Sequence, residues 1–359
     1  MIETLKHCIN ALAAPTIFLP LVAAAFFLVL HFYRTITRPK VALGILIGAI
    51  LFYVVSLFDP NFQHIVAKPD NVPITIMLLL CGFCVWLALR QAAINDERME
   101  RGLPPLEKES SETIFVWPDL VYIEFLSAIL VGVILTLWSI ELKAPLEQPA
   151  SPFKAPNPSK APWYFLGLQE MLVYFDPWLA GVVFPSLIIS GLISIPYMDT
   201  NPRGSGYYSF KQRRMSITIY LFGFLFLWVT LIMLGTFFRG PNWNFFGPYE
   251  FWDVHKVEPL VNINLSEIIY VKLLHTGMPA HWLPREIWGL LLVGFYLFAL
   301  PPILQKTVLK KFYAEMGFVR YNVFMMHFLM MMMLPLKMIC RWMFNLKYFV
   351  AVTEFFFNI

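Results

Sequence analysis

The sequence predicts an all-α membrane protein: a polytopic membrane helix bundle of about eight transmembrane helices, with a short interfacial helix in a long outer loop. Of the 359 residues, 58% are hydrophobic and only 14% are charged, and the mean hydropathy is +0.65. Soluble domains carry about 25% charged residues. In addition, eight apolar stretches reach, or nearly reach, the roughly 20 residues that cross a hydrocarbon core. Composition and hydropathy together therefore exclude an ordinary soluble domain.

The eight predicted spans follow one another along the whole chain. They cover residues 14–33, 41–58, 73–93, 119–140, 178–198, 214–238, 285–306 and 320–344. Each is expected to be a helix, because backbone polar groups inside lipid must be satisfied within the segment. The first span is not followed by a small-residue cleavage site, so we interpret it as a retained helix rather than a signal peptide.

Lysine and arginine residues predict the orientation of these spans. The basic connections are 34–40, 94–118, 199–213 (which includes Arg203) and 306–320. They share one side of the membrane in an eight-helix alternation, so we expect that side to be cytoplasmic and both termini to lie outside. The outer connections are then 59–72, 141–177 and 239–284. Three cations near the last span, Lys337, Arg341 and Lys347, oppose this rule.

The stretch WYFLGLQEMLVYF at 163–175 predicts a short helix lying at the outer membrane surface. Tryptophan and tyrosine suit the membrane interface, and Pro162 suits the first turn of a helix, where a missing N–H does no harm. Asp176 and Pro177 are expected to end this helix before the next span.

Glu170 is the candidate catalytic residue of this short helix. Spacings of four and seven residues place Glu170, Trp163 and Tyr174 on one helix face. A carboxylate on an aromatic face at the membrane boundary is costly to desolvate, and such a carboxyl can exchange protons in a reaction. The alternative is a simple interfacial helix with a solvated Glu170.

Three consecutive stretches carry a family resemblance. They read VWPDLVYIEFLSAILVGVILTLWS (116–139), APLEQPASPFKAPNPSKAPWYFLGLQE (144–170) and DPWLAGVVFPSLIISGLISIPYMD (176–199). In this order they resemble the C-terminal domain of cytochrome b, as in subunit IV of the cytochrome b6-f complex and in split bacterial quinol:cytochrome c reductases.

The resemblance covers about 115–240 and divides the chain into three parts. We expect a three-helix N-terminal membrane region with a cytoplasmic linker (1–114), the cytochrome b C-terminal (subunit IV-like) domain (115–240), and an outer aromatic loop with two C-terminal membrane helices (241–359).

The resemblance implies a quinol-oxidation site on the outer side, whose usual signature is Pro-Glu-Trp-Tyr. Trp163 and Tyr164 match this signature, but Pro162 stands where the family has glutamate, and proline cannot take a proton. We therefore predict that Pro162, Trp163, Tyr164 and Tyr174 bind quinol and that Glu170 replaces the missing proton acceptor.

The resemblance also implies a quinone-reduction site on the cytoplasmic side, near the start of the 119–140 span. The corresponding residues are Tyr122, Glu124 and Phe125. An intramembrane carboxylate is a functional candidate by default. Two interpretations of Glu124 remain open: it feeds protons to quinone reduction, or it pairs with a basic residue at the membrane edge.

No metal site is predicted on this chain. Only His31 and His327 fall within spans, in different helices, so the two histidine pairs that hold two haems in cytochrome b cannot be assembled. Cys81 and Cys84 lie inside an apolar run with no histidine after them, and we interpret both as small core residues.

The resemblance places the redox cofactors on partner chains. It implies haem b on a haem-bearing cytochrome b subunit and an iron-sulfur cluster on a Rieske iron-sulfur protein, with a c-type cytochrome as a further partner. The complex is expected to be dimeric, surrounded by membrane lipids, and located in a bacterial-type energy-transducing inner membrane. The ligand is quinol or quinone; menaquinone is our working choice, although no residue identifies it. No nucleic-acid patch is visible.

The predicted function is that of a membrane subunit in a cytochrome bc/Rieske-type complex, forming part of the outer site for quinol-to-cytochrome c electron transfer with proton release. One alternative is a structural or transport subunit that kept the fold but lost quinol chemistry. Another is a quinone-binding membrane anchor of a different redox complex.

Overall fold

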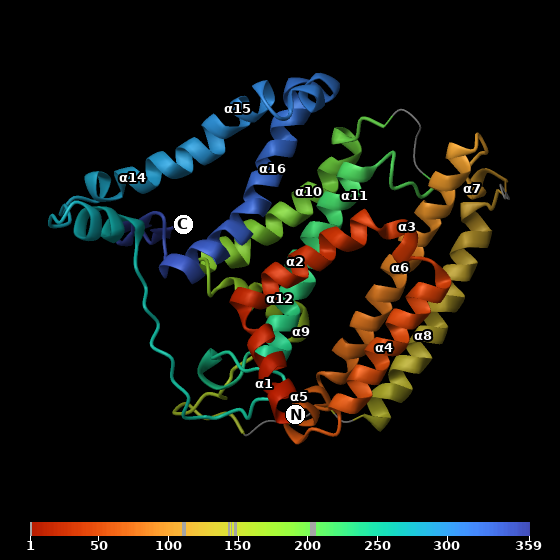
Figure 1. The fold of residues 1–359 in the computed structure, drawn as a ribbon, viewed down its shortest axis with the longest axis horizontal. Coiled ribbons are helices and arrows are strands. Elements are labelled where there is room, and N and C mark those ends of the chain that lie inside the picture. Colours follow the sequence, from red (N-terminus) through yellow and green to blue (C-terminus); the bar gives the residue numbers. More distant parts are fainter. Residues whose placement is uncertain (1, 110–112, 143, 145, 147–148, 202–205) are drawn as a thin grey trace. The chain divides into compact units, whose positions relative to one another are not determined.

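The computed structural model describes residues 2–109, 113–142, 144, 146, 149–201 and 206–359, so Arg203 of the basic connection lies outside the described residues. The described residues form mostly helices (Figure 1). Near the C-terminus, β1 (Ala351–Val352) and β2 (Phe357–Asn358) pair as a small antiparallel hairpin. It divides into two compact units. Unit 1 comprises residues 1–159, 204–222 and 236–256, and unit 2 comprises residues 160–203, 223–235 and 257–359.

Seven helices in the described residues are long and apolar enough to cross a membrane. They are α4 (Pro39–Ser56), α6 (Val72–Glu100), η1 with α8 (Val116–Glu141), η2 with α10 (Leu179–Met198), α11 through η4 (Arg214–Phe238), α14 through α15 (Trp282–Lys306) and α16 (Lys310–Phe344). The helix α2 (Pro15–His31) occupies the remaining predicted span. The predicted polytopic helical fold is therefore confirmed.

The remaining elements either connect the spans or are the segments into which a single span divides. They are α3 (Tyr33–Ile36), α5 (Pro60–Val66), α7 (Leu106–Glu109), η1 (Val116–Leu120), α8 (Val121–Glu141), α9 (Trp163–Met171), η2 (Leu179–Val183), α10 (Phe184–Met198), α11 (Arg214–Leu221), η3 (Phe222–Val229), α12 (Thr230–Met233), η4 (Leu234–Phe238), η5 (Pro241–Trp243), α13 (Leu265–Glu267), η6 (Ile268–Leu273), α14 (Trp282–Gly294), η7 (Phe295–Ala299), α15 (Leu300–Lys306) and η8 (Thr353–Phe355). Of these, α9 is the predicted interfacial helix. It ends at Met171 rather than at residue 175, because the next residues form hydrogen-bonded turns.

An N-terminal helix, α1 (Ile2–Ala13), precedes the first span and was not predicted. It is bent by 80° from α2. The bend lies at Ala14, which has extended backbone angles, and Pro15 then starts α2 with the φ that a first helical turn requires. Lys6 of α1 forms a 2.7 Å ion pair with Asp59. This contact joins α1 to the 59–72 connection within unit 1.

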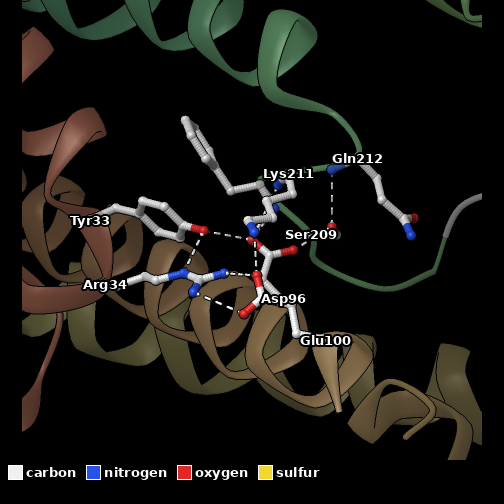
Figure 2. A network of polar contacts seen from close by, with 8 residues as sticks. Tyr33, Arg34, Asp96, Glu100, Ser209, Lys211 and Gln212 are labelled. Atoms are coloured by element: carbon white, nitrogen blue, oxygen red, sulfur yellow. Dashed lines mark hydrogen bonds and ion pairs between the residues drawn. The ribbon is translucent and has the colours of Figure 1, made fainter. Parts of the chain in front are cut away.

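A buried polar network holds the basic connection of unit 1 in place (Figure 2). The carboxylate of Asp96, near the end of α6, accepts hydrogen bonds from Tyr33 and from Ser209. Beside it, Arg34 forms a two-point ion pair with Glu100. Residues 206–213 are therefore attached to α3 and α6, which belong to the N-terminal region outside the family resemblance.

Unit 2 packs α10, η7 and α15 against α16. Its core contains Met316, Tyr321, Met325 and Leu329 of α16, with Tyr296 packed against them. The hydroxyl of Tyr321 donates to the carbonyl of Pro301, and that of Tyr296 donates to the carbonyl of Leu329. These bonds satisfy the polar tips of two aromatic side chains inside an apolar core.

The cysteine prediction is wrong for Cys84. That side chain is exposed on α6, and Cys81 is only half-buried. Because α6 is apolar around most of its circumference, sequence periodicity could not distinguish its packed side from its lipid-facing side.

Candidate functional site

The helix α9 is positioned by the proline before it and by its own glutamine. Pro162 is the N-cap, with extended backbone angles, and its carbonyl accepts a 2.8 Å hydrogen bond from Phe165 N–H. The N–H of Ala161 donates to Oε1 of Gln169, also at 2.8 Å. The entering chain is thus folded back along the helix it starts, which fixes the direction in which α9 begins.

One face of α9 is packed against α12 at close range. Leu166, Gly167, Glu170 and Met171 are buried on this face, and Glu170 has no exposed surface. A Cβ atom on Gly167 would lie 3.4 Å from Ile232. That distance is an ordinary van der Waals contact, so the two helices pack directly against each other at this position.

The first turn of α9 carries three consecutive exposed aromatic residues. Trp163 is 38% exposed, and Tyr164 and Phe165 are each 51% exposed. The rings of Trp163 and Tyr164 meet edge-to-face with centroids 5.6 Å apart, and those of Tyr164 and Phe165 lie 4.7 Å apart. We call Trp163, Tyr164 and Phe165 the aromatic face of α9.

The predicted quinol-site residues thus fall into two groups. Pro162, Trp163 and Tyr164 are exposed, whereas Glu170 and Tyr174 are buried. Tyr174 lies in the turn after α9 and packs edge-to-face on Trp342, with ring centroids 6.2 Å apart. Pro162, Trp163 and Tyr164 therefore lie at the start of α9. Glu170 lies in its last turn, and Tyr174 lies in the turn that follows.

The turn after α9 also contacts the C-terminal part of the chain, which sequence reasoning did not assign to the site. Tyr348 donates a 3.1 Å hydrogen bond to Asp176. Burial, together with the Asp176 carboxylate, raises the pKa of Tyr348 to about 12. Burial and the neighbouring Arg341 lower the pKa of Lys347. This corner of unit 2 is therefore a polar cluster at one end of α9.

The three cations that oppose the positive-inside rule belong to this corner. Arg341 is 8% exposed and donates to the carbonyls of Val261 and Asn345, at 3.0 and 3.1 Å. Lys337 has no exposed surface. Arg341 thus satisfies backbone carbonyls near the end of α16. The breach of the charge rule was the sequence signal that could have identified this cluster.

The residues predicted for quinone reduction lie on α8 in unit 1. Tyr122 and Phe125 are 63% and 60% exposed, and Glu124 is exposed as well. No part of the most apolar stretch of this span is buried within the described chain. A carboxylate within a membrane-spanning helix is costly to leave in lipid, so Glu124 remains a candidate functional residue.

Metal ligands do not gather anywhere in the described part of the chain: no group of three or more histidine, cysteine, aspartate or glutamate residues could hold an ion there. His327 has structural partners. Its Nε2 lies 3.0 Å from the Ser190 hydroxyl, and its Nδ1 lies 2.8 Å from the carbonyl of Val323.

The region of the chain that contains α9 matches a known protein family. Residues 149–251 match the family model described as Cytochrome b(C-terminal)/b6/petD. This stretch is similar to the C-terminal region of cytochrome b, and we refer to it as the cytochrome b C-terminal region. The recognition made from the sequence is therefore confirmed. The match begins later than the predicted boundary at 115, extends past 240, and covers fewer than half of the residues. No solved structure matches the chain.

The cytochrome b C-terminal region contains α9, its aromatic face and Glu170. It also contains the basic connection that Asp96 holds. Together with the apolar helices, the match supports an integral membrane protein of an energy-transducing membrane. It further supports a membrane subunit of a cytochrome bc/b6-f-type redox complex, in which haem and quinone are associated with the assembly.

Proposed function

We propose that this chain forms part of the outer quinol-oxidation site of a cytochrome bc/Rieske-type complex. The quinol gives one electron to the iron-sulfur cluster of a Rieske partner and one to the haems of a cytochrome b partner, and its two protons leave on the outer side. A c-type cytochrome is the final acceptor. The observation that carries this proposal is the aromatic face of α9, exposed at the family's quinol-site signature within the matched region.

The exposed aromatic rings suit a flat, apolar headgroup. Aromatic pairs attract one another in offset or edge-to-face arrangements, and a quinone ring can stack against such a surface. Trp163 and Tyr164 form this wall, with Pro162 at its edge. Partner chains must complete the cavity, because the aromatic face is open in the isolated chain.

Glu170 is the proposed proton acceptor. Tyr174 lies in the turn that follows the C-terminal end of α9, near Glu170 in the sequence. Burial of Glu170 beside α12 keeps it away from bulk water, so a proton it receives passes through the protein rather than directly to solvent. In this step the O–H bond of the quinol breaks, the proton passes to the carboxylate, and the bonding electron pair stays on the quinol oxygen.

Pro162 supports a second candidate function. It stands where the family has glutamate, it is exposed, and it cannot exchange protons. A structural or transport subunit that kept the fold and lost quinol chemistry accounts for this substitution. A quinone-binding anchor of another redox complex is a third candidate, and it predicts a native assembly without a two-haem cytochrome b.

Purified native complex provides the test. We expect Glu170→Gln to lower quinol oxidation about a hundredfold, which is typical of a lost acid–base group, and Tyr164→Leu to raise the KM for quinol. Tyr197→Leu is the matched control, because Tyr197 is 75% exposed on α10 of the same unit. Normal turnover in both test variants, with normal assembly, would favour the structural candidate. The haem spectrum of the same sample decides the third candidate.

A further inference from the structure

The helix α1 (Ile2–Ala13) has an apolar side and a polar side, and both are exposed. Successive residues of an α-helix lie about 100° apart around its axis. With that spacing, one side of α1 carries three apolar side chains that are each at least half exposed: Ile2, Leu5 and Leu12. The roughly opposite side carries three exposed polar side chains: Glu3, Thr4 and His7. We call Ile2, Leu5 and Leu12 the apolar face of α1.

A third side of α1, between these two, is attached to unit 1. Nζ of Lys6 lies 2.7 Å from the carboxylate of Asp59, and Oδ1 of Asn10 accepts a 3.0 Å hydrogen bond from the N–H of Tyr249. Beside that bond, a Cβ atom on Gly247 would lie 2.5 Å from Asn10, so glycine allows this close approach. These contacts fix the rotation of α1 about its own axis, and they leave its apolar face turned away from the protein.

The direction of α1 follows from its junction with the first span. α1 is bent by 80° from α2, and a single residue, Ala14, separates the two helices. Transmembrane helices tilt by about 20° on average from the bilayer normal, so a helix nearly perpendicular to one of them lies close to the membrane plane. Ile17 and Leu21, in the first two turns of α2, are exposed as well. Exposed apolar surface therefore continues from α1 across the bend into the span.

These features suit a helix at a membrane surface. An interfacial helix buries its apolar side among the acyl chains next to the headgroups and keeps its polar side in water. The apolar and polar sides of α1 are opposite, and the side that contacts the protein lies between them, so one rotation of the helix satisfies all three surroundings. Glu3 and Lys6 pair with each other at 3.1 Å, so the attraction comes from apolar burial and not from anionic headgroups.

We propose that α1 lies on the outer surface of the bilayer, with its apolar face inserted among the lipid acyl chains. The leaflet follows from its contacts, because Asp59 and Tyr249 belong to the 59–72 and 239–284 connections, which are both predicted to be outer. Tyr249 also stacks on Phe62 of α5, with ring centroids 5.7 Å apart. α1 thereby holds residues 247–250, at the end of the matched region, at the level of the headgroups. This inference does not depend on quinol chemistry.

Photo-crosslinking in a bilayer tests this proposal. The photoreactive amino acid p-benzoyl-phenylalanine replaces Leu5 or Leu12 on the apolar face, and Thr4 or His7 on the polar side of the same helix is the matched control position. The purified native complex is reconstituted into nanodiscs of phosphatidylethanolamine and phosphatidylglycerol and illuminated, and its peptides are identified by mass spectrometry. We expect acyl-chain adducts at Leu5 and Leu12 and their loss at Thr4 and His7.

Three results would overturn the proposal. Equal lipid labelling on both sides of the helix contradicts the orientation of α1. Adducts to a protein chain in place of lipid at Leu5 and Leu12 show that the apolar face is a protein interface. The third is the absence of adducts at both apolar positions, with Leu51, exposed on α4, as the position that reports a working photoreaction. If the probe at Leu5 prevents assembly, Ile2 and Leu12 carry the same comparison.

Discussion

The hydroxyl of Tyr33 donates a 2.8 Å hydrogen bond to Oδ2 of Asp96, whose side chain is only 1% exposed. The same carboxylate accepts a 2.7 Å bond from Ser209 and bonds from the backbone N–H groups of Phe210 and Lys211 (Figure 2). Four donors on one buried carboxylate join α3, α6 and the basic connection. Residues outside the family resemblance therefore position a part of the cytochrome b C-terminal region.

Replacing Asp96 with asparagine is expected to loosen this connection. The amide carries no charge and introduces donors that face other donors, so the free energy of unfolding should fall by about 2–4 kcal/mol. The thermal midpoint of the detergent-solubilised protein measures the effect. Asp70→Asn is the matched control, since Asp70 lies in an exposed ion pair with Lys68. An equal midpoint for the two variants would contradict the structural role of Asp96.

Gly235 is expected to be essential for the docking of α9. A Cβ atom there would lie 3.3 Å from the carbonyl oxygen of Leu166, so Gly235→Leu must displace α9 from the residues it packs on. We expect lower thermal stability and a loss of quinol oxidation. Gly294→Leu tests the specificity of this effect, because a Cβ at Gly294 meets nothing within 4 Å. Full activity in Gly235→Leu would show that the position of α9 is unimportant.

Asp59 should make the stability of unit 1 depend on pH. Burial tends to raise its pKa, but hydrogen bonds from Lys6 and from the N–H groups of Phe62 and Asn61 outweigh it and lower the pKa. A lowered folded-state pKa contributes stability that is present above the unfolded value, near 3.9, and is lost as the pH falls through the folded value.

The thermal midpoint of the wild type should therefore fall relative to that of Asp59→Asn as the pH drops below about 4. At neutral pH the variant should be the less stable of the two, by up to about 1 kcal/mol, because it keeps the helix cap but loses the ion pair with Lys6. Midpoints that stay parallel across the whole acid range would contradict this assignment.

Replacing Glu124 should affect quinone reduction on the cytoplasmic side and leave quinol oxidation on the outer side unchanged. If it supplies protons for quinone reduction, Glu124→Gln slows reoxidation of the b haems by added quinone about a hundredfold and leaves quinol oxidation unchanged. Glu141→Gln, an exposed carboxylate at the opposite end of α8, is the control. A loss of assembled complex instead of a slower rate would show that Glu124 pairs with a basic residue of a neighbour.

Much of the helical architecture could be predicted from the sequence. The spans were identified to within a few residues, except that α6 continues to Glu100; α16 is interrupted at Gly317, close to the predicted start of the last span at residue 320. The start of α9 at Trp163 was also predicted, because proline and the aromatic run mark it. The burial of Glu170 could not be predicted, since it depends on the packing of α9 against α12 and on the close approach of Gly235 to Leu166, which join segments far apart in the chain.

The sequence by itself determined which segments are apolar enough to span a membrane and where α9 begins, and it carried the family resemblance, because hydropathy and local motifs are written in consecutive residues. Only the tertiary structure decided that Glu170 is buried while Tyr164 is exposed, and that Lys337 lies against Phe175. Those facts depend on contacts between residues far apart in the chain. Burial and charge surroundings arise from such contacts, and they set the chemistry of the candidate site.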